Sequence, residues 1–252
     1  MRIDRYMAEN GLAVSRAKAQ EILKSGAVTV NGRPINKPAF EVDAEDSVCV
    51  ADTEVTRYVS RGGLKLEAAL DAFALSPKGQ IALDVGASSG GFTDCLLRRG
   101  AAFVYAVDSG SDQLHPTLRA DGRVCSMENC NARALTQSAF ARIPRFSVMD
   151  VSFISQTLIL PAILSVMTEG GVLVSLVKPQ FELGRAALGK SGVVKSEKDA
   201  KRALSDVCTF AQTLGYRLIG TIPSPIRGGD GNLEFLAAFL VPSLEERSKN
   251  DG

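Results

Sequence analysis

Four ionisable residues stand in apolar surroundings near the ends of predicted strands, where their side chains could carry proton-transfer chemistry. They are Lys65 in VSRGGLKLEAAL, Asp150 in SVMDVSFIS, Lys178 in SLVKPQFE and Glu234 in GNLEFLAAF. Buried lysines and glutamates need partners, and here two cations and two anions could satisfy one another. Each residue could instead be a surface charge at the end of an element. Because His115 is the single histidine, acid–base chemistry falls to Lys, Asp, Glu or Tyr.

A glycine loop follows the first predicted strand and reads Asp84-Val-Gly86-Ala-Ser88-Ser-Gly90-Gly91-Phe92. Glycines let the backbone turn sharply and approach a ligand, and the next helix offers its N-terminal amides to an anionic group. A nicotinamide-binding loop would need G-x-G-x-x-G, whereas this loop reads G-x-x-x-G-G. A serine-hydrolase elbow, G-x-S-x-G, matches at Ser88. However, its catalytic triad needs a histidine late in the chain, and His115 comes too early.

An S-adenosylmethionine loop fits this segment better. Asp84 precedes the glycines, where an acid can help to hold the amino-acid end of that cofactor. Asp108 ends the next apolar run 24 residues later, where an acid accepts hydrogen bonds from ribose hydroxyls. The spacing alone does not separate the ribose of NAD from that of S-adenosylmethionine. The glycine pattern separates them and favours S-adenosylmethionine.

Alternating apolar runs and helical stretches from about residue 80 predict the elements that position these side chains. The runs QIALDV, AAFVYAVD, RVCSM, RFSVMD and GGVLVSLVK predict a doubly wound parallel sheet of the α/β class, buried on both faces. Ligands bind at the carboxyl ends of such strands. The polar residues after the runs are therefore site candidates: Asp84, Asp108, Glu128 to Asn131, Asp150 and Lys178. YRLIGTIPSP and NLEFLAAFLV predict an antiparallel edge pair, and Ser196 is expected to cap a helix that reaches Leu214.

The N-terminal 40 residues predict a small basic module. Residues 1–40 carry seven Lys or Arg against three Asp or Glu, whereas residues 41–55 carry six acids and no base. Such a module suits an anionic partner, although a solvated face would give the same pattern. Ser15 is expected to cap a helix through Lys24, and Asn31-Gly32 predicts a hairpin turn. The expected inner face of that helix is Ala17, Ala19, Ile22 and Leu23, with Arg16, Lys18 and Lys24 pointing outward.

Composition excludes several classes of protein. With 252 residues, 45% hydrophobic and 23% charged, the chain is long and apolar enough for a sizeable core. No segment approaches the ~18 apolar residues of a membrane helix, and the first residues lack a signal-peptide pattern, so we expect a cytoplasmic protein. Five cysteines without a CxxC motif predict reduced thiols, and we expect no metal site.

Long motifs carry a resemblance to a known family. RIDRYMAENGLAVSRAKAQEILKSGAVTVNGRPINKP resembles the S4-like RNA-binding domain, with R-I-D, G-L-x-x-S-R, G-x-V-x-V-N-G and K-P at the usual spacing. The glycine loop and the Lys-Asp-Lys-Glu set resemble the FtsJ-like ribose 2′-O-methyltransferases. These features and the motifs VSRGGLKL, NAR-L and DVSFIS together make the chain similar to the TlyA family of rRNA 2′-O-methyltransferases. Many members of that family are labelled haemolysins. One departure lies in the linker. Where the family has Arg-x-Trp-Val, this chain has Thr56-Arg57-Tyr58-Val59.

The resemblance implies roles for particular residues. Lys178 would be the base or proton acceptor, Asp150 would hold it, and Lys65 and Glu234 would complete the network and position the ribose. S-adenosyl-L-methionine would be bound by Asp84, Gly86, Ser88, Gly90, Gly91, Phe92, Asp108 and Asn131, the last favoured over Glu128 and Asn129 for the adenine. RNA would be contacted by Arg2, Arg5, Arg16, Lys18, Lys24 and Arg33, unless Arg2 and Asp4 form only a surface pair.

The resemblance also implies a domain order and a partner. We expect an S4-like α+β domain at 1–58, a linker at 59–64, a Rossmann-like methyltransferase domain at 65–243 and a polar tail at 244–252. The expected partner is rRNA within a subunit or ribosome, and the expected acceptor is a cytidine 2′-hydroxyl in large-subunit rRNA, with small-subunit rRNA as a second candidate. We expect a monomer. The alternatives are an inactive RNA-binding protein, a membrane-lytic haemolysin and a pseudouridine synthase.

Overall fold

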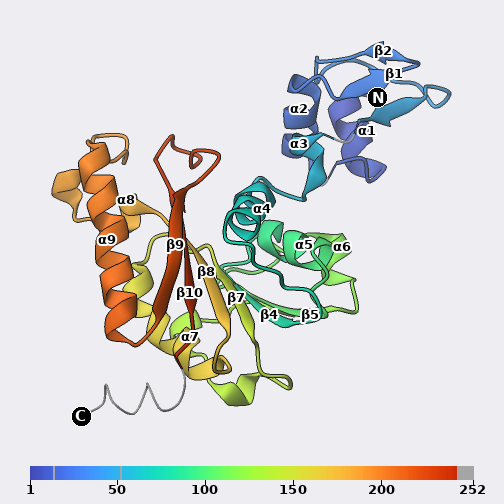
Figure 1. Cartoon of the computed structure of the whole chain (residues 1–252). Coiled ribbons are helices and arrows are strands. Elements are labelled where there is room, and N and C mark those ends of the chain that lie inside the picture. The colour runs from blue at the N-terminus through green and yellow to red at the C-terminus, as the bar shows by residue number, and fades with distance from the viewer. Residues whose placement is uncertain (14, 52, 243–252) are drawn as a thin grey trace. The chain divides into compact units, whose positions relative to one another are not determined.

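The computed structural model describes residues 1–13, 15–51 and 53–242, and the chain divides into two compact units between Arg61 and Gly62 (Figure 1). This division falls inside the predicted linker, 59–64. The predicted polar tail, 244–252, lies outside the described residues. We describe each unit by itself.

The first unit combines three helices with a small antiparallel sheet of order β2-β1-β3 in the described part of the chain. Its elements are α1 (Ile3–Glu9), α2 (Arg16–Lys24), β1 (Val28–Val30), β2 (Arg33–Pro34), β3 (Val48–Val50) and α3 (Glu54–Arg57). The Ser15 hydroxyl accepts a hydrogen bond from the Lys18 amide at 3.1 Å, which confirms the predicted cap of α2. Asn31 and Gly32 take positive φ angles of 50° and 77° between β1 and β2, so the predicted turn is also confirmed.

The predicted inner face of α2 is partly wrong. Lys18 is buried with Ala19, Ile22 and Leu23, whereas Ala17 is exposed. The buried stripe uses positions i, i+1, i+4 and i+5, and Lys18 occupies the first of them. Its aliphatic stem covers apolar surface while its ammonium reaches Glu21 at 3.2 Å. Lys18 therefore does not point freely outward.

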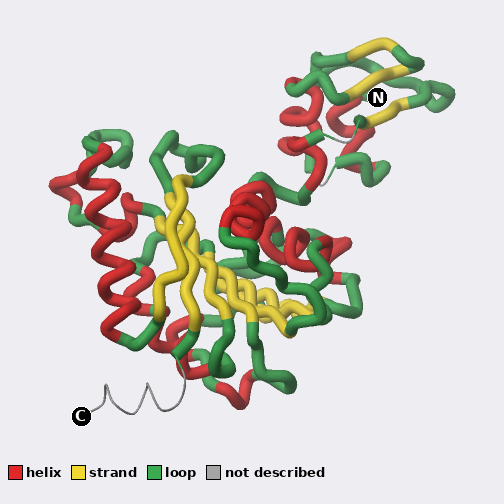
Figure 2. The backbone as a smooth tube through the Cα atoms, in the orientation of Figure 1, coloured by secondary structure: helices red, strands yellow, loops and turns green. Residues whose placement is uncertain are grey.

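The second unit is built on a sheet that has seven strands in the described residues, in the order β6-β5-β4-β7-β8-β10-β9 (Figure 2). The strands are β4 (Ile81–Val85), β5 (Phe103–Val107), β6 (Val124–Met127), β7 (Phe146–Met149), β8 (Val172–Val177), β9 (Arg217–Pro223) and β10 (Phe235–Leu240). The first five are parallel, and β10 runs antiparallel to both β8 and β9. The predicted parallel sheet and its antiparallel edge pair are both confirmed.

Helices cover both faces of this sheet, as a doubly wound fold requires (Figures 1 and 2). Side chains of α7 and α9 share one apolar core with Leu83 and Val85, and α4 and α5 pack together on the other face. The α-helices are α4 (Gly62–Ala72), α5 (Gly91–Arg98), α6 (Pro116–Arg119), α7 (Leu160–Val166), α8 (Pro179–Glu182) and α9 (Glu197–Thr213). The 3₁₀ turns are Ala132–Ala134, Gln137–Ala139, Gln156–Leu158 and Arg185–Ala187. The Ser196 hydroxyl caps α9 through the Asp199 amide at 3.0 Å, as predicted.

Strand register gathers the predicted catalytic residues at one edge. Asp150 directly follows β7, and Lys178 directly follows its neighbour β8. Phe235 of β10 lies opposite Val177 of β8, so Glu234, one residue before β10, reaches the same edge from an antiparallel strand. Lys65 lies within the first turns of α4, which begins at Gly62.

Candidate active site

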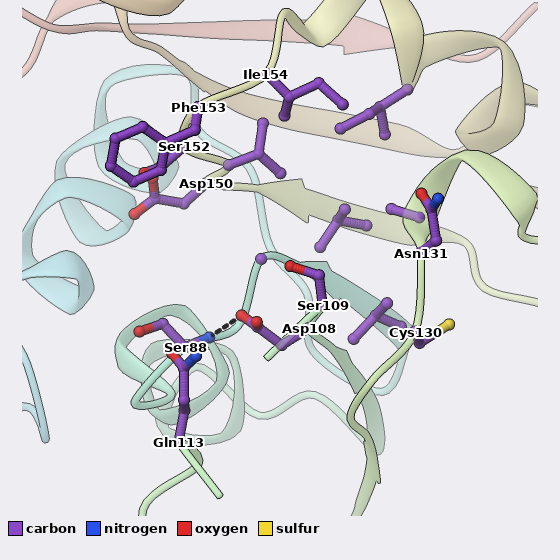
Figure 3. Close-up of a pocket in the computed structure, with 16 residues that line it drawn as sticks. Ser88, Asp108, Ser109, Gln113, Cys130, Asn131, Asp150, Ser152, Phe153 and Ile154 are labelled. Carbon is purple, nitrogen blue, oxygen red and sulfur yellow. Dashed lines mark hydrogen bonds between the residues drawn. The ribbon is translucent and has the colours of Figure 1, made fainter. Parts of the chain in front are cut away.

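A cavity of about 370 Å³ opens at the carboxyl edge of the sheet, among the loops that follow β4, β5, β6 and β7 (Figure 3). Five residues predicted from the sequence line it: Gly86, Ser88, Asp108, Asn131 and Asp150. Cys130, within the predicted range Glu128 to Asn131, also lines it, whereas sequence reasoning missed several others: Ser109, Gln113, Val151, Ser152, Phe153 and Ile154. These residues follow the same strand ends, so the rule that found Asp108 and Asp150 could have been extended to them.

Asp108 forms one wall of the cavity. Its Oδ2 accepts a hydrogen bond from the Ser88 amide at 2.7 Å, and its Oδ1 accepts one from the Gly110 amide at 2.8 Å (Figure 3). The carboxylate therefore joins the glycine loop after β4 to the loop after β5. Carboxylate oxygens retain further lone pairs, so Asp108 can also accept hydrogen bonds from a ligand.

Position 86 requires glycine because the backbone there passes close to the backbone of Asp150. Its φ is +83°, and a β-carbon there would lie 2.3 Å from the Asp150 carbonyl oxygen. A side chain at Gly86 would therefore push apart the loop after β4 and the segment that carries Asp150. Because glycine has no side chain, the glycine loop can lie directly against Asp150, one of the catalytic candidates.

Asp84 is fully buried and is not among the residues that line the cavity, although Val85 and Gly86, which follow it in the chain, are. Its Oδ2 accepts a hydrogen bond from the Thr93 hydroxyl at 2.7 Å, but its Oδ1 has no hydrogen-bond partner in the described structure. Burial raises the pKa of Asp84 to about 7, and the negative charges of Asp150 and Asp108 add to the rise. An orphaned buried carboxylate oxygen of this kind is suited to a cationic ligand group.

Three predicted cofactor residues shape the loop without lining the cavity. Phe92 is buried in the core, and Gly91 is the first residue of α5. Gly90 takes a φ of +94°, and a β-carbon there would lie 2.3 Å from the Leu118 side chain. These residues fix the turn into α5 rather than face the cavity.

The four ionisable candidates form two ion pairs. Lys178 Nζ lies 2.6 Å from Asp150 Oδ1 and donates a hydrogen bond to the Ser152 hydroxyl at 2.8 Å. Lys65 Nζ lies 2.5 Å from Glu234 Oε2, and both side chains are largely withdrawn from solvent. A lone charge in such surroundings would be costly, so each pair stabilises both of its members.

Glu182 joins the two segments that carry the Lys178–Asp150 pair. Its carboxylate accepts hydrogen bonds from the Ser155 hydroxyl at 2.5 Å and from the Gln156 amide at 2.9 Å. Burial raises the pKa of Glu182, while these two hydrogen bonds oppose the rise. The Gln156 side chain donates to the Leu176 carbonyl of β8 at 2.6 Å. The loop after β7 is therefore fastened to β8 and α8, next to Lys178.

Phe153 is the exposed aromatic residue of the cavity. Its side chain is 91% exposed, its φ is +64°, and its ring lies 5.0 Å from that of Phe181. A bulky residue rarely adopts this backbone conformation. The fold thus holds an apolar ring in water, next to Asp150 and Ser152, at a cost in both solvation and strain.

The residues after β6 have different surroundings. The carboxylate of Glu128 accepts hydrogen bonds from the amides of Asp112, Gln113 and Leu114 at 2.9 to 3.4 Å, and it pairs with Arg119 at 2.8 Å. Glu128 thus shapes the loop that carries Gln113, whereas Asn131 itself lines the cavity.

In the first unit, the predicted RNA-binding cations divide into three groups. Arg2 and Asp4 do form the ion pair that was the alternative interpretation, at 3.1 Å, although Asp4 is fully buried rather than at the surface. The Asp4 carboxylate accepts hydrogen bonds from Arg2 and Arg16 at 3.1 Å and from Gln20 at 2.9 Å. Burial would raise the pKa of Asp4, but these hydrogen bonds outweigh it and hold the pKa well below its usual range. Arg5, Lys24 and Arg33 are exposed, and Lys18 is the buried exception.

Comparisons with known proteins identify both units. The profile of the FtsJ-like methyltransferases matches residues 58–240, and that of the S4 domain matches residues 1–48. The enzyme TlyA of Mycobacterium tuberculosis, named as a 16S/23S rRNA (cytidine-2′-O)-methyltransferase, is 42% identical over 234 residues, which cover 93% of this chain and 87% of that protein. The chain belongs to the TlyA family. The predicted fold class and the predicted S4 and FtsJ-like resemblances are therefore confirmed.

Other members of the TlyA family are similar along nearly the whole chain. YqxC of Bacillus subtilis, named as a candidate rRNA methyltransferase, is 45% identical over 96% of this chain and 86% of its own length. The solved structure of a candidate haemolysin from Streptococcus thermophilus matches with a TM-score of 0.76 and 41% identity, and covers 100% of this chain and 93% of that one. As a TlyA-family protein, the chain is an RNA methyltransferase of the S-adenosylmethionine-dependent class.

Two features of the described residues, 1–13, 15–51 and 53–242, concern membranes and metal ions. No helix there is long and apolar enough to cross a bilayer. Within the same residues, no group of three or more His, Cys, Asp or Glu side chains could hold a metal ion.

The raised pKa of Asp84 predicts a pH-dependent stability. The folded protein holds this proton up to about pH 7, whereas an unfolded aspartate loses it near pH 4. The free energy of unfolding should therefore fall as pH rises from 5 to 7, by about 2 kcal/mol at ~1.4 kcal/mol per pKa unit. Asp84→Asn removes this slope. Urea denaturation at several pH values measures it, and the exposed substitution Asp206→Asn should keep the slope of the unsubstituted protein. An equal slope in Asp84→Asn would contradict the assignment.

Proposed function

We propose that this protein transfers a methyl group from S-adenosylmethionine to the 2′-hydroxyl of a cytidine in ribosomal RNA. The observation that carries the proposal is the pair of ion pairs, Lys178–Asp150 and Lys65–Glu234, at the cavity edge of an FtsJ-like sheet. The relatives named for rRNA methylation, at 42% to 45% identity over nearly the whole chain, support the choice of substrate class.

The cavity fits S-adenosylmethionine in three respects. The orphaned Asp84 oxygen suits the cationic amino group of the cofactor's methionine part. The Asp108 carboxylate suits the ribose hydroxyls, and we assign the adenine to Asn131, which lines the same cavity. The close approach at Gly86 keeps the cofactor loop next to Asp150. When bound, the cofactor supplies a methyl group on a sulfonium, which is open to attack by an oxygen nucleophile.

The protein's own residues supply proton handling and orientation. Lys178, with its amine in the neutral form, accepts the proton of the 2′-hydroxyl as the oxygen bonds to the methyl carbon and the carbon–sulfur bond breaks to leave a neutral thioether. Asp150 and Ser152 hold its Nζ in place at 2.6 and 2.8 Å. Lys65, on α4, and Glu234, directly before β10, position the ribose. Since reacting atoms must be held about 3–3.5 Å apart, this orientation contributes alongside the proton transfer.

Lys178→Ala should remove methyl transfer while leaving cofactor affinity unchanged. General-base catalysis contributes about 10²- to 10⁴-fold, so we expect a rate loss of at least that order. Transfer of label from S-adenosylmethionine to rRNA measures the rate, and calorimetric titration measures cofactor binding. Lys78→Ala, an exposed lysine at the opposite edge of the sheet, serves as the matched control. Near-normal transfer by Lys178→Ala would disprove the proton-acceptor role.

To identify the substrate, methyl transfer is measured to purified large and small ribosomal subunits, each tested separately. Label on the large subunit at a cytidine 2′-oxygen is the expected result, and label on both subunits would show that small-subunit rRNA is a second substrate. If neither subunit accepts label although the cofactor binds, the proposed substrate is wrong and an inactive RNA-binding protein becomes the better interpretation.

Phe153 should stack on a nucleotide base, because aromatic rings recognise unstacked RNA bases and this ring is held in water at the cavity. Stacking contributes roughly 1–3 kcal/mol per base, so Phe153→Asn should reduce transfer about 5- to 150-fold. Asparagine tolerates the positive φ, so the melting temperature should not fall. Leu158→Asn, which replaces another exposed apolar residue, is the comparison. Equal activity in both variants would refute the stacking role.

A further inference from the structure

The segment after α8 is a strongly basic surface that the proposed mechanism does not use. Residues 184–202 carry six exposed cations and two acids. Lys201 pairs with Glu197 at 2.7 Å, and Arg202 pairs with Asp199 at 3.2 Å. The other four cations form no ion pair among the residues that the structure describes: Arg185, Lys190, Lys195 and Lys198. We call these four cations, together with the exposed Arg227 in the loop between β9 and β10, the basic rim.

The basic rim is fixed next to the catalytic candidates by a buried side chain. Asn232 is 1% exposed, and its side chain accepts a hydrogen bond from the Val194 amide at 2.9 Å and donates one to the Gly192 carbonyl at 3.3 Å. Asn232 stands two residues before Glu234. The basic segment is therefore fastened to the loop that presents the Lys65–Glu234 pair.

Other contacts hold the rim in shape. Leu188 and Val194 form a β-bridge that closes the segment into a loop, and Lys195 Nζ donates to the Ala186 carbonyl at 2.9 Å. Arg227 donates to the Gly231 carbonyl at 2.9 Å. In Figure 1 the loop above α9 and the loop joining β9 to β10 lie at the same end of the second unit. The cations thus project from an anchored scaffold.

We propose that the basic rim binds the phosphates of the RNA strand that carries the target nucleotide, as a second RNA contact separate from the S4 unit. This inference rests on the proposed function. Residues 184–202 contain no aromatic side chain to stack on a base, so the rim recognises backbone charge rather than sequence. Its attachment through Asn232 places that contact beside the Lys65–Glu234 pair, where it would hold the strand against the cavity.

The test substitutes the three rim cations whose side chains make no hydrogen bond among the described residues, as Arg185→Ala/Lys190→Ala/Lys198→Ala. Binding to purified large ribosomal subunits is measured between about 50 and 200 mM salt, since each released phosphate contact contributes ~0.7–0.9 to the slope of log K against log salt. We expect this negative slope to become shallower by about 2 in the substituted protein. We also expect the KM for the subunit to rise at least tenfold, with kcat and cofactor affinity unchanged.

Two further variants make the result decisive. Lys78→Ala/Arg145→Ala/Arg217→Ala removes three exposed cations at the opposite edge of the same sheet, and it should leave the slope unchanged. Arg185→Lys/Lys190→Arg/Lys198→Arg keeps the charge and should restore the slope, which separates charge from folding. An unchanged slope in the first variant, or a loss of kcat without a change in KM, would overturn the proposal. Failure of the unsubstituted protein to methylate would count against the proposed function alone, because binding needs no transfer.

Discussion

The pairing of buried charge at the carboxyl edge of the sheet is the constraint on which the second unit depends. Lys178 and Asp150 follow neighbouring parallel strands, and Lys65 meets Glu234 across 169 positions of the chain. A lone charge at these places would be destabilising by several kcal/mol, so the pairs can persist only when β7, β8, β10 and α4 are all in register. The same contacts therefore assemble the candidate site and complete the fold, and an error in strand order would leave charges unpaired.

Much of this arrangement could be predicted from the sequence, because it follows from short-range patterns. Apolar runs fixed the strands, and polar residues directly after them, such as Asp108 and Asp150, had to share one edge of a parallel sheet. Glu234 was harder to place. Its strand runs antiparallel, so it reaches that edge from the beginning of β10 rather than from its end, and apolar periodicity alone does not give strand direction.

The features that escaped prediction depend on contacts between distant segments or on atom-level burial. The role of Glu182 arises only when α8 lies against the loop after β7. Phe153 lies in the apolar segment VSFIS, yet its φ is positive and its side chain is exposed to solvent. Lys18 was assigned to the outer face by its charge, although a lysine stem can complete a buried stripe when its ammonium has a nearby acid.

The two units use a buried carboxylate in opposite ways. Asp4 gathers Arg2 and Arg16, whose side chains stay 47% and 55% exposed, so the carboxylate sets their spacing while their outer faces can still meet phosphate. Asp150 instead holds Lys178, whose side chain is only 13% exposed, so little of its amine meets solvent. Exposure of the cation, rather than the type of pair, therefore separates the proposed RNA-binding surface from the proposed proton acceptor.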